Sequence, residues 1–258
     1  MTTGYAYVVK ASYGNDSVAL IQWAFEQNLE NVAVLYNDTG WSSRDWDARV
    51  TEMEAWAASL GFNPFRTKSI GMEELVRKKK SWPRQGIQFC TQELKIAPSI
   101  KWLEDNDPQA TSVQLIGVRR EESANRAAFP EFSVDMQKRT VWAPLVAHTE
   151  QMRNALLERA GVAPLPHRSM ECFPCINSNR QDLRELAKDT ARVEEIAELE
   201  NSLGFTSKGK PRTMFRPYRY MGATGIKEII RWAECERGEF SLDDGNESSG
   251  CEAGWCGL

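Results

Sequence analysis

Near the N-terminus, a strand-like run leads directly into a short polar loop and then into a helical pattern. Residues 5–11 are mostly β-forming or small apolar residues, the loop reads Ser12-Tyr13-Gly14-Asn15-Asp16-Ser17, and amphipathic spacing starts at Val18. Such an order places backbone N–H groups and hydroxyls at a helix N-terminus, whose dipole adds roughly half a positive charge. Gly14 would let the backbone approach a ligand closely. We therefore expect an anion site, although Asp16 and Ser17 would also suit helix capping.

Strand and helix patterns alternate through the first half of the chain. Continuous apolar runs predict buried parallel strands at 31–36 and 113–118, and a short strand is expected at 63–67. Helices are expected over 49–60 and 149–160. This alternation predicts an α/β fold with a doubly wound, mostly parallel sheet and right-handed crossovers.

Two of these strands end in polar turns, Asn37 to Gly40 and Arg119 to Ser123. In open α/β sheets, ligands bind at the carboxyl ends of the strands. Both turns are therefore expected to face a ligand together with the first loop.

The last third of the chain differs in composition. Alternating Glu and Arg or Lys over 181–203 predicts one long solvated helix that Gly204 ends. Residues 206–220 interleave basic and aromatic side chains, which suits single-stranded nucleic acid or a loop packed on the domain surface, and we favour the loop. From Gly238 the chain is acidic and rich in Gly and Ser, so a flexible tail is expected. We predict an α/β domain that contains the anion site over 1–180 and a helical extension with a tail over 181–258.

Charge and hydropathy limit the class of protein. The formal net charge of −4 argues against a surface that coats duplex nucleic acid. The basic run 77–80 is interpreted as a solvated helix end. No apolar stretch of 18 residues occurs and no signal-peptide core precedes the first strand, so we expect no membrane contact and a cytoplasmic location.

Six cysteines in a reducing compartment favour metal or redox chemistry over structural disulfides. Cys172 and Cys175 form a Cys-x-x-Cys pair, and Cys251 and Cys256 lie in the tail. Cys90 and Cys235 are isolated.

These motifs together resemble the phosphoadenosine phosphosulfate (PAPS) reductase family, within the adenine nucleotide α-hydrolase-like superfamily. Ser12-Tyr13-Gly14 resembles the Ser-Phe-Gly of the reductases, whereas Asp16-Ser17 resembles the end of the Ser-Gly-Gly-Lys-Asp-Ser pyrophosphate loop, with Asn15 at the lysine position. Asp38-Thr39-Gly40 is similar to the Asp-Thr-Gly of the reductases, and 117–126 to their Gly-x-Arg-x-x-(Glu/Gln)-Ser-x-x-Arg segment. Guanidinium forks of this kind bind phosphate or sulfate bidentately. The resemblance extends over about residues 5–180.

The resemblance implies that an adenine nucleotide binds at these strand ends. The residues that it assigns to nucleotide binding are Ser12, Gly14, Asn15, Asp16, Ser17, Asp38, Thr39, Gly40, Lys95, Gly117, Arg119, Arg120, Glu122, Ser123 and Arg126. Asp16 is also a candidate catalytic residue. Residues 255–258 are similar to the Glu-Cys-Gly-(Leu/Ile)-His tail of sulfonucleotide reductases, which implies that Cys256 is the nucleophile.

The cysteines outside the tail have family counterparts as well. Residues 90–98 resemble the Cys-Thr-x-x-Leu-Lys-x-x-Pro of DNA-phosphorothioation ATP pyrophosphatases, and lie where iron–sulfur adenylylsulfate reductases carry a double cysteine. Phe89 stands at the first of those two positions. The resemblance implies a 4Fe–4S cluster, or alternatively zinc, on the thiolates of Cys90, Cys172 and Cys175. Cys251 is the predicted fourth ligand, and Cys256, an exogenous ligand or an open iron position are the alternatives.

Three functions are compatible with these observations. The favoured one is reduction of PAPS or adenylylsulfate to sulfite, by a thiolate and a thioredoxin-like donor. The second is an ATP pyrophosphatase-type sulfurtransferase, with Mg²⁺ near Asp16 or Asp38, a cysteine-desulfurase sulfur donor and a nucleic-acid acceptor. The third is a non-catalytic nucleotide- or nucleic-acid-binding module with structural zinc.

Overall fold

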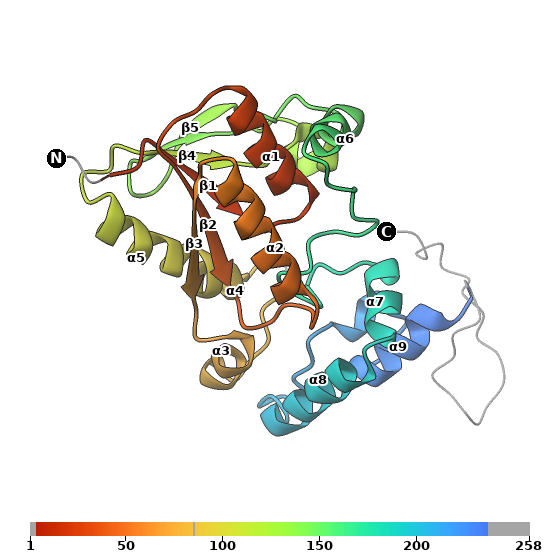
Figure 1. Ribbon diagram of the computed structural model, residues 1–258. Coiled ribbons are helices and arrows are strands. Elements are labelled where there is room, and N and C mark those ends of the chain that lie inside the picture. The colour runs from red at the N-terminus through yellow and green to blue at the C-terminus, as the bar shows by residue number, and fades with distance from the viewer. Residues whose placement is uncertain (1–3, 85, 237–258) are drawn as a thin grey trace. The chain divides into compact units, whose positions relative to one another are not determined.

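The computed structural model describes residues 4–84 and 86–236, which separate into two compact units. The sheet unit comprises Met1–Gly71 and Thr91–Cys172, and the helical unit comprises Met72–Cys90 and Phe173–Leu258 (Figure 1). Residues 72–90 thus group with the C-terminal helices. The division of the chain at residue 180 stays a prediction.

The sheet unit is built on a six-stranded sheet in the order β3-β2-β1-β4-β6-β5. Neighbouring strands are parallel except for the antiparallel pair of β5 and β6. The strands are β1 (Tyr7–Ala11), β2 (Val32–Asp38), β3 (Asn63–Lys68), β4 (Val113–Ile116), β5 (Phe132–Val134) and β6 (Thr140–Trp142). The predicted mostly parallel α/β fold is confirmed.

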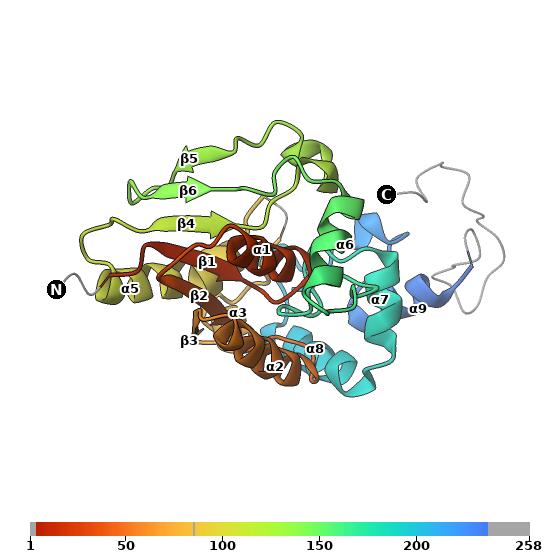
Figure 2. The same cartoon turned by 45° about the horizontal axis from the view of Figure 1, so that its top comes forward.

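Helices cover both faces of this sheet (Figure 2). Because side chains alternate along a strand, Val9 and Ala11 of β1 enter one core while Val8 enters the other. The first core is closed by α1 (Asn15–Glu26), α2 (Trp46–Ser59) and α6 (Glu150–Arg159), and the second by α5 (Ala97–Asn106). The sheet is therefore doubly wound, as the sequence predicts.

A short helix and one π-helical turn precede α5. They are α4 (Phe89–Thr91) and the π-helix Gln92–Ile96. Pro98 lies in the first turn of α5, directly after the π-helical turn.

The helical unit contains α3 (Met72–Lys79), α7 (Arg180–Ala187), α8 (Thr190–Leu203) and α9 (Ile226–Glu234). The prediction of one helix over 181–203 is wrong, because the chain breaks between α7 and α8. Asp189 caps the second helix by accepting a hydrogen bond from the backbone N–H of Arg192 at 3.0 Å. Gly204, with a φ of +62°, ends α8 as expected.

Three 3₁₀ turns complete the described secondary structure: Arg120–Glu122, Ala124–Arg126 and Pro217–Arg219. Within residues 4–84 and 86–236, no helix has both the length and the apolar character needed to cross a membrane. The predicted flexible tail, including Cys251 and Cys256, lies outside the described residues.

Candidate nucleotide site

The first loop is held by hydrogen bonds between its own hydroxyls and backbone groups. Ser12 Oγ accepts a hydrogen bond from the Gly14 N–H at 3.4 Å and lies 3.5 Å from Ser17 Oγ, which donates to the Gly14 carbonyl at 3.1 Å. Gly14 is the N-cap of α1, and no side chain of the described residues makes a capping hydrogen bond there. The capping role considered for Asp16 and Ser17 is thus not realised. The start of α1 keeps N–H groups that can bind an anion.

The glycines of this region allow close approach between segments of the protein itself. A Cβ placed on Gly14 would lie 2.8 Å from the Cβ of Ser169, closer than real side chains come. A Cβ on Gly117 would lie 3.0 Å from the carbonyl oxygen of Asp16. At Gly14 the described structure therefore shows a packing constraint, and the expected close approach of a ligand stays a prediction.

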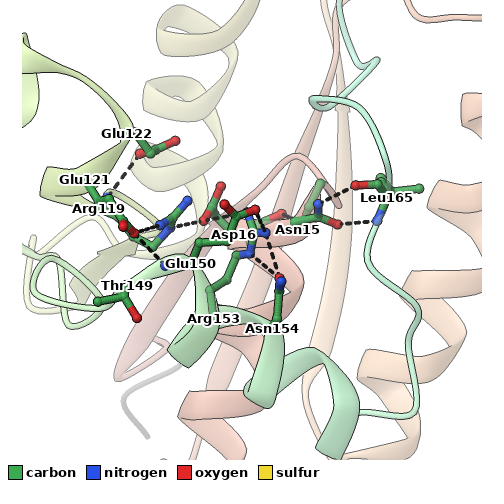
Figure 3. Close-up of polar contacts among 12 residues, drawn as sticks. Asn15, Asp16, Arg119, Glu121, Glu122, Thr149, Glu150, Arg153, Asn154 and Leu165 are labelled. Carbon is green, nitrogen blue, oxygen red and sulfur yellow. Dashed lines mark hydrogen bonds and ion pairs between the residues drawn. The ribbon is translucent and has the colours of Figure 1, made fainter.

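Asp16 lies between two buried arginines (Figure 3). Its Oδ1 is 2.5 Å from Nε of Arg119, which follows β4, and 3.8 Å from Nη1 of Arg153 on α6. Arg119 and Arg153 are only 5% and 7% exposed. Burial of Arg119 opposes its charge, but the hydrogen bond and the charge of Asp16 outweigh it and raise the pKa of the guanidinium. Both cations are therefore held in place at the edge of the sheet.

The segment after β4 is organised by ion pairs between its own residues. Glu122 accepts a hydrogen bond from the Arg119 backbone N–H at 3.1 Å and pairs with Arg126. Glu121 pairs with Arg119 at 3.2 Å and accepts from the N–H of Glu150 at 2.5 Å. The pairing considered for Glu121 is thus present, and Glu122 pairs as well.

Two more predicted residues of this segment are exposed. Arg120 donates from Nε to the carbonyl of Phe129 at 2.9 Å, and Ser123 is the extended residue before the turn Ala124–Arg126. The side chains of Arg120 and Arg126 remain accessible to solvent. These two cations can therefore reach a bound anion.

The turn after β2 is fixed by its own side chains. Asp38 Oδ1 accepts from the Gly40 N–H at 2.8 Å, and the buried Thr39 hydroxyl donates to the carbonyl of Glu171 at 2.6 Å. Gly40 has a φ of +60°, and a Cβ there would lie 2.9 Å from the Cα of Gly71. Both the backbone conformation and the contact require glycine.

Asn15 and Lys95 are engaged by the segment 165–171. The amide of Asn15 donates to the Leu165 carbonyl at 2.9 Å and accepts from the Leu165 N–H at 2.8 Å. Lys95 forms an ion pair with the Glu171 carboxylate. With Thr39 also bound to this segment, all three residues hold it against the carboxyl ends of the strands.

All of the predicted nucleotide-binding residues belong to the sheet unit. Because β1, β2 and β4 are adjacent and parallel, their carboxyl ends and the turns that follow come to one edge of the sheet. Sequence reasoning missed Arg153, Ser169 and Glu171. Their partners lie far away in the sequence. The one indication in the sequence was that Arg153 falls on the helix predicted over 149–160.

His148 is a further residue that the sequence did not single out. Burial, followed by the charge of Arg119, lowers the pKa of its imidazole. Its Nδ1 is buried, and no described residue forms a hydrogen bond with that atom. We therefore expect a neutral imidazole close to the arginine pair at neutral pH.

The cysteines predicted to bind a metal fall in both units. Cys172 is in the sheet unit and forms an isolated β-bridge with Trp41. Cys90 and Cys175 are in the helical unit, where the N–H of Asn177 donates to the sulfur of Cys175 at 3.5 Å. Within the described part of the chain, no group of three or more His, Cys, Asp or Glu residues could hold a metal ion. A cluster that includes Cys251 therefore stays a prediction.

Comparison with known proteins gives the following matches. A PAPS reductase from Candida auris in a phosphate complex is 15% identical over 63% of this chain and 76% of that chain, with a TM-score of 0.46. An NH3-dependent NAD synthetase from Campylobacter jejuni in complex with a nitrate ion is 17% identical over 79% of this chain and 81% of that chain, with a TM-score of 0.41. No curated protein matches the sequence.

The family model of the phosphoadenosine phosphosulfate reductase domain matches residues 6–188. This range is well over half of the chain and includes every residue of the nucleotide site described above. The chain therefore belongs to the phosphoadenosine phosphosulfate reductase domain family.

Proposed function

We propose that this protein is a sulfonucleotide reductase that binds PAPS or adenylylsulfate and releases sulfite. The observation that carries the proposal is the pair of buried arginines, Arg119 and Arg153, held by Asp16 next to the start of α1. Paired cations beside helix N–H groups suit a ligand with several anionic groups. The family match supports an adenine nucleotide as that ligand.

In this proposal, different residues at the strand ends bind different parts of the nucleotide. The N–H groups at the start of α1, with the hydroxyls of Ser12 and Ser17, contact the phosphate that is linked to the adenosine. The exposed guanidinium groups of Arg120 and Arg126 contact the outer anionic groups. Asp16 is a positioning residue, because its carboxylate orients Arg119 and Arg153.

The proposed chemistry requires two thiol steps. The Cys256 thiolate attacks the sulfur of the sulfonucleotide, so that an S–S bond forms and the S–O bond breaks. The adenylate leaves with the electron pair, and the cysteine carries an S-sulfonate. One thiolate of a thioredoxin-like dithiol then attacks the Cys256 sulfur and releases sulfite, and its second thiol resolves the mixed disulfide. The substrate sulfur is reduced by two electrons while the donor becomes a disulfide.

The predicted iron–sulfur cluster, or zinc, on the cysteines is tested separately from the sulfonucleotide reaction. The thiol steps above involve the chain's own cysteine and the donor dithiol, and the metal-binding cysteines are a separate part of the proposal. A 4Fe–4S cluster on Cys90, Cys172, Cys175 and Cys251 would absorb broadly in the visible, whereas zinc would leave the protein colourless. Metal analysis and an absorbance spectrum of the purified protein test this part separately.

The pairing of Asp16 also bears on the ATP-dependent alternative. That reaction needs Mg²⁺, which is bound through carboxylate oxygens. Asp16 is engaged by Arg119 and Arg153, so a Mg²⁺ ion at its carboxylate would compete with these two cations. This pairing at Asp16 supports the reductase over the ATP pyrophosphatase.

The test is to incubate the full-length protein with PAPS, adenylylsulfate or ATP and Mg²⁺, each with a dithiol donor. We expect sulfite from one of the sulfonucleotides and no pyrophosphate from ATP. Cys256→Ser should abolish sulfite release, and the matched variant Cys235→Ser should retain it. Pyrophosphate release from ATP without sulfite would overturn the proposal in favour of the sulfurtransferase.

A further inference from the structure

Two segments of the helical unit carry positive charge without any acidic residue between the cations. Over 75–90 the chain has Arg77, Lys78, Lys79, Lys80 and Arg84 and no Asp or Glu. Over 201–227 it has Lys208, Lys210, Arg212, Arg216, Arg219 and Lys227 and again no Asp or Glu. Both segments are unusual in a chain whose net charge is −4.

A side-chain hydrogen bond joins the two segments in space. Nη1 of Arg77, near the end of α3, donates to Oγ of Ser202 in the last turn of α8 at 3.0 Å. Ser202 is the second residue of the second basic segment and lies two residues before Gly204. The basic end of α3 therefore lies beside the start of that segment, within the helical unit (Figure 1).

The second segment begins with a structured hairpin. Phe205 and Pro211 form an antiparallel bridge, and the N–H of Thr206 donates to the Lys210 carbonyl at 2.8 Å. Gly209 turns the chain with a φ of +70°. The turn thus presents Lys208 and Lys210, both exposed, on a fixed backbone.

The aromatic residues of the second segment have two different environments. Phe215 and Tyr220 are 3% and 8% exposed, and Tyr220 packs edge-on against Trp232 with the ring centroids 4.9 Å apart. They belong to the core of the helical unit, as the packed-loop interpretation predicted. Phe205, at the base of the hairpin, is 69% exposed. Its ring is therefore open to a partner.

We propose that a basic surface, made of Arg77–Lys80 and the hairpin 204–212, binds single-stranded nucleic acid. The lysines would neutralise successive phosphates, and an unpaired base would stack on Phe205. Single strands are favoured because a duplex hides its base faces and because the chain as a whole is acidic. The inference does not depend on the sulfonucleotide reaction, since none of these residues belongs to the nucleotide site.

The test uses fluorescence anisotropy of a labelled single-stranded oligonucleotide of about 16 bases with the full-length protein. We expect binding that weakens with salt, and Lys208→Gln with Lys210→Gln should reduce the magnitude of the salt slope by about 1.4, since each lysine contact contributes about 0.7. Phe205→Ala should weaken binding roughly fivefold or more. The matched control is the double variant Lys101→Gln and Lys188→Gln, two exposed lysines outside the surface, which should bind as the wild type does.

Several outcomes would overturn the proposal. They are equal affinities of the hairpin variant and the control, tighter binding of a duplex than of a single strand, and equally effective competition by polyglutamate, which would indicate an acidic protein as partner. Displacement of the oligonucleotide by adenosine 3′,5′-bisphosphate would place its binding at the nucleotide site instead. If the oligonucleotide binds as expected while no sulfite is formed, this inference stands and the reductase proposal fails.

Discussion

The sheet unit and the helical unit stabilise carboxylates removed from full solvent exposure in opposite ways. Asp16 in the sheet unit is bracketed by Arg119 and Arg153. Glu200 in the helical unit is 8% exposed and forms no ion pair with a described residue. Its two oxygens instead accept from the backbone N–H groups of Met214 and Ile226, at 2.9 and 2.8 Å. Burial raises the pKa of Glu200 to about 7, although these two hydrogen bonds oppose the rise.

The cations of the two units differ in a related way. Arg119 and Arg153 of the sheet unit are buried and oriented by carboxylates, which prepares them for one ligand geometry. The lysines of the helical unit's basic surface are exposed on flexible stems, which suits a polyanion of variable sequence. We therefore expect the sheet unit to bind a small anion in one orientation. We expect the helical unit to bind a polyanion mainly through the density of its charges.

The largest effect is expected for Arg119→Ala, which removes the closer cation from Asp16. Breaking a buried pair costs about 3–5 kcal/mol, and the partial exposure of Asp16 places this variant at the lower end. Urea unfolding should show that loss, and calorimetry should show no binding of adenosine 3′,5′-bisphosphate. Arg120→Ala, which changes an exposed neighbour, should lose less than about 1 kcal/mol of stability. Equal destabilisation by the two variants would contradict the contrast between buried and exposed cations.

The next effect is a dependence of stability on pH that originates in Glu200. Its folded-state pKa of about 7 lies above its ordinary value of 4.5, so the folded protein binds more protons than the unfolded chain between these values. Stability should therefore fall as the pH rises through this window, by up to about 3 kcal/mol. The measurement is urea unfolding at pH values from 4.5 to 8.

Two variants isolate this contribution. Glu200→Gln should flatten the pH profile, although it loses one acceptor for a backbone N–H. Glu198→Gln changes an exposed glutamate on the same helix and should keep the slope. An unaltered slope in Glu200→Gln would show that another group causes the dependence.

The sequence contains enough information for most of the sheet unit. Continuous apolar runs predicted β2 and β4, β3 was expected after the helix before it, and the turn Asp38-Thr39-Gly40 follows its strand as expected, because strands and turns depend mainly on neighbouring residues. Arg153 was missed because its contact with Asp16 depends on how α6 packs on α1. The same limit applies to the bond between Arg77 and Ser202, which joins segments 125 residues apart.

The error over 181–203 has a local cause. The charge pattern continues through the break, so that periodicity alone predicts one helix. Asp189 favours hydrogen bonding to a backbone N–H over a place in a helix interior, and it starts a new helix there. The sequence analysis therefore overlooked Asp189 as a capping residue, because the helical charge pattern continues on both sides of it.

Gly14→Ala tests how rigidly the sheet unit holds its anion loop. The added methyl group would lie 2.8 Å from the Cβ of Ser169, and such overpacking costs about 1–3 kcal/mol. Thermal unfolding should show the loss. Ser169→Gly removes the opposing Cβ, so the double variant should recover most of the stability lost by Gly14→Ala alone. Additive losses in the double variant would mean that the loop does not depend on this contact.

The smallest effect is expected in the helical unit, for Glu73→Gln on α3. Glu73 pairs with Arg77 at 2.9 Å, with the two side chains 61% and 50% exposed, so the pair should contribute less than about 0.5 kcal/mol to stability. Removing this carboxylate leaves the basic surface more positive, and oligonucleotide affinity should rise by roughly twofold at low salt.

Glu158→Gln, an exposed change on α6 in the sheet unit, is the matched control and should leave that affinity unchanged. An affinity that falls, or that rises equally in both variants, would mean that the exposed cations of α3 do not contact the strand. A rise in Glu73→Gln alone would show that the exposed cations of the helical unit respond to local charge at little cost in stability, whereas Arg119 and Arg153 in the sheet unit are buried and held by ion pairs.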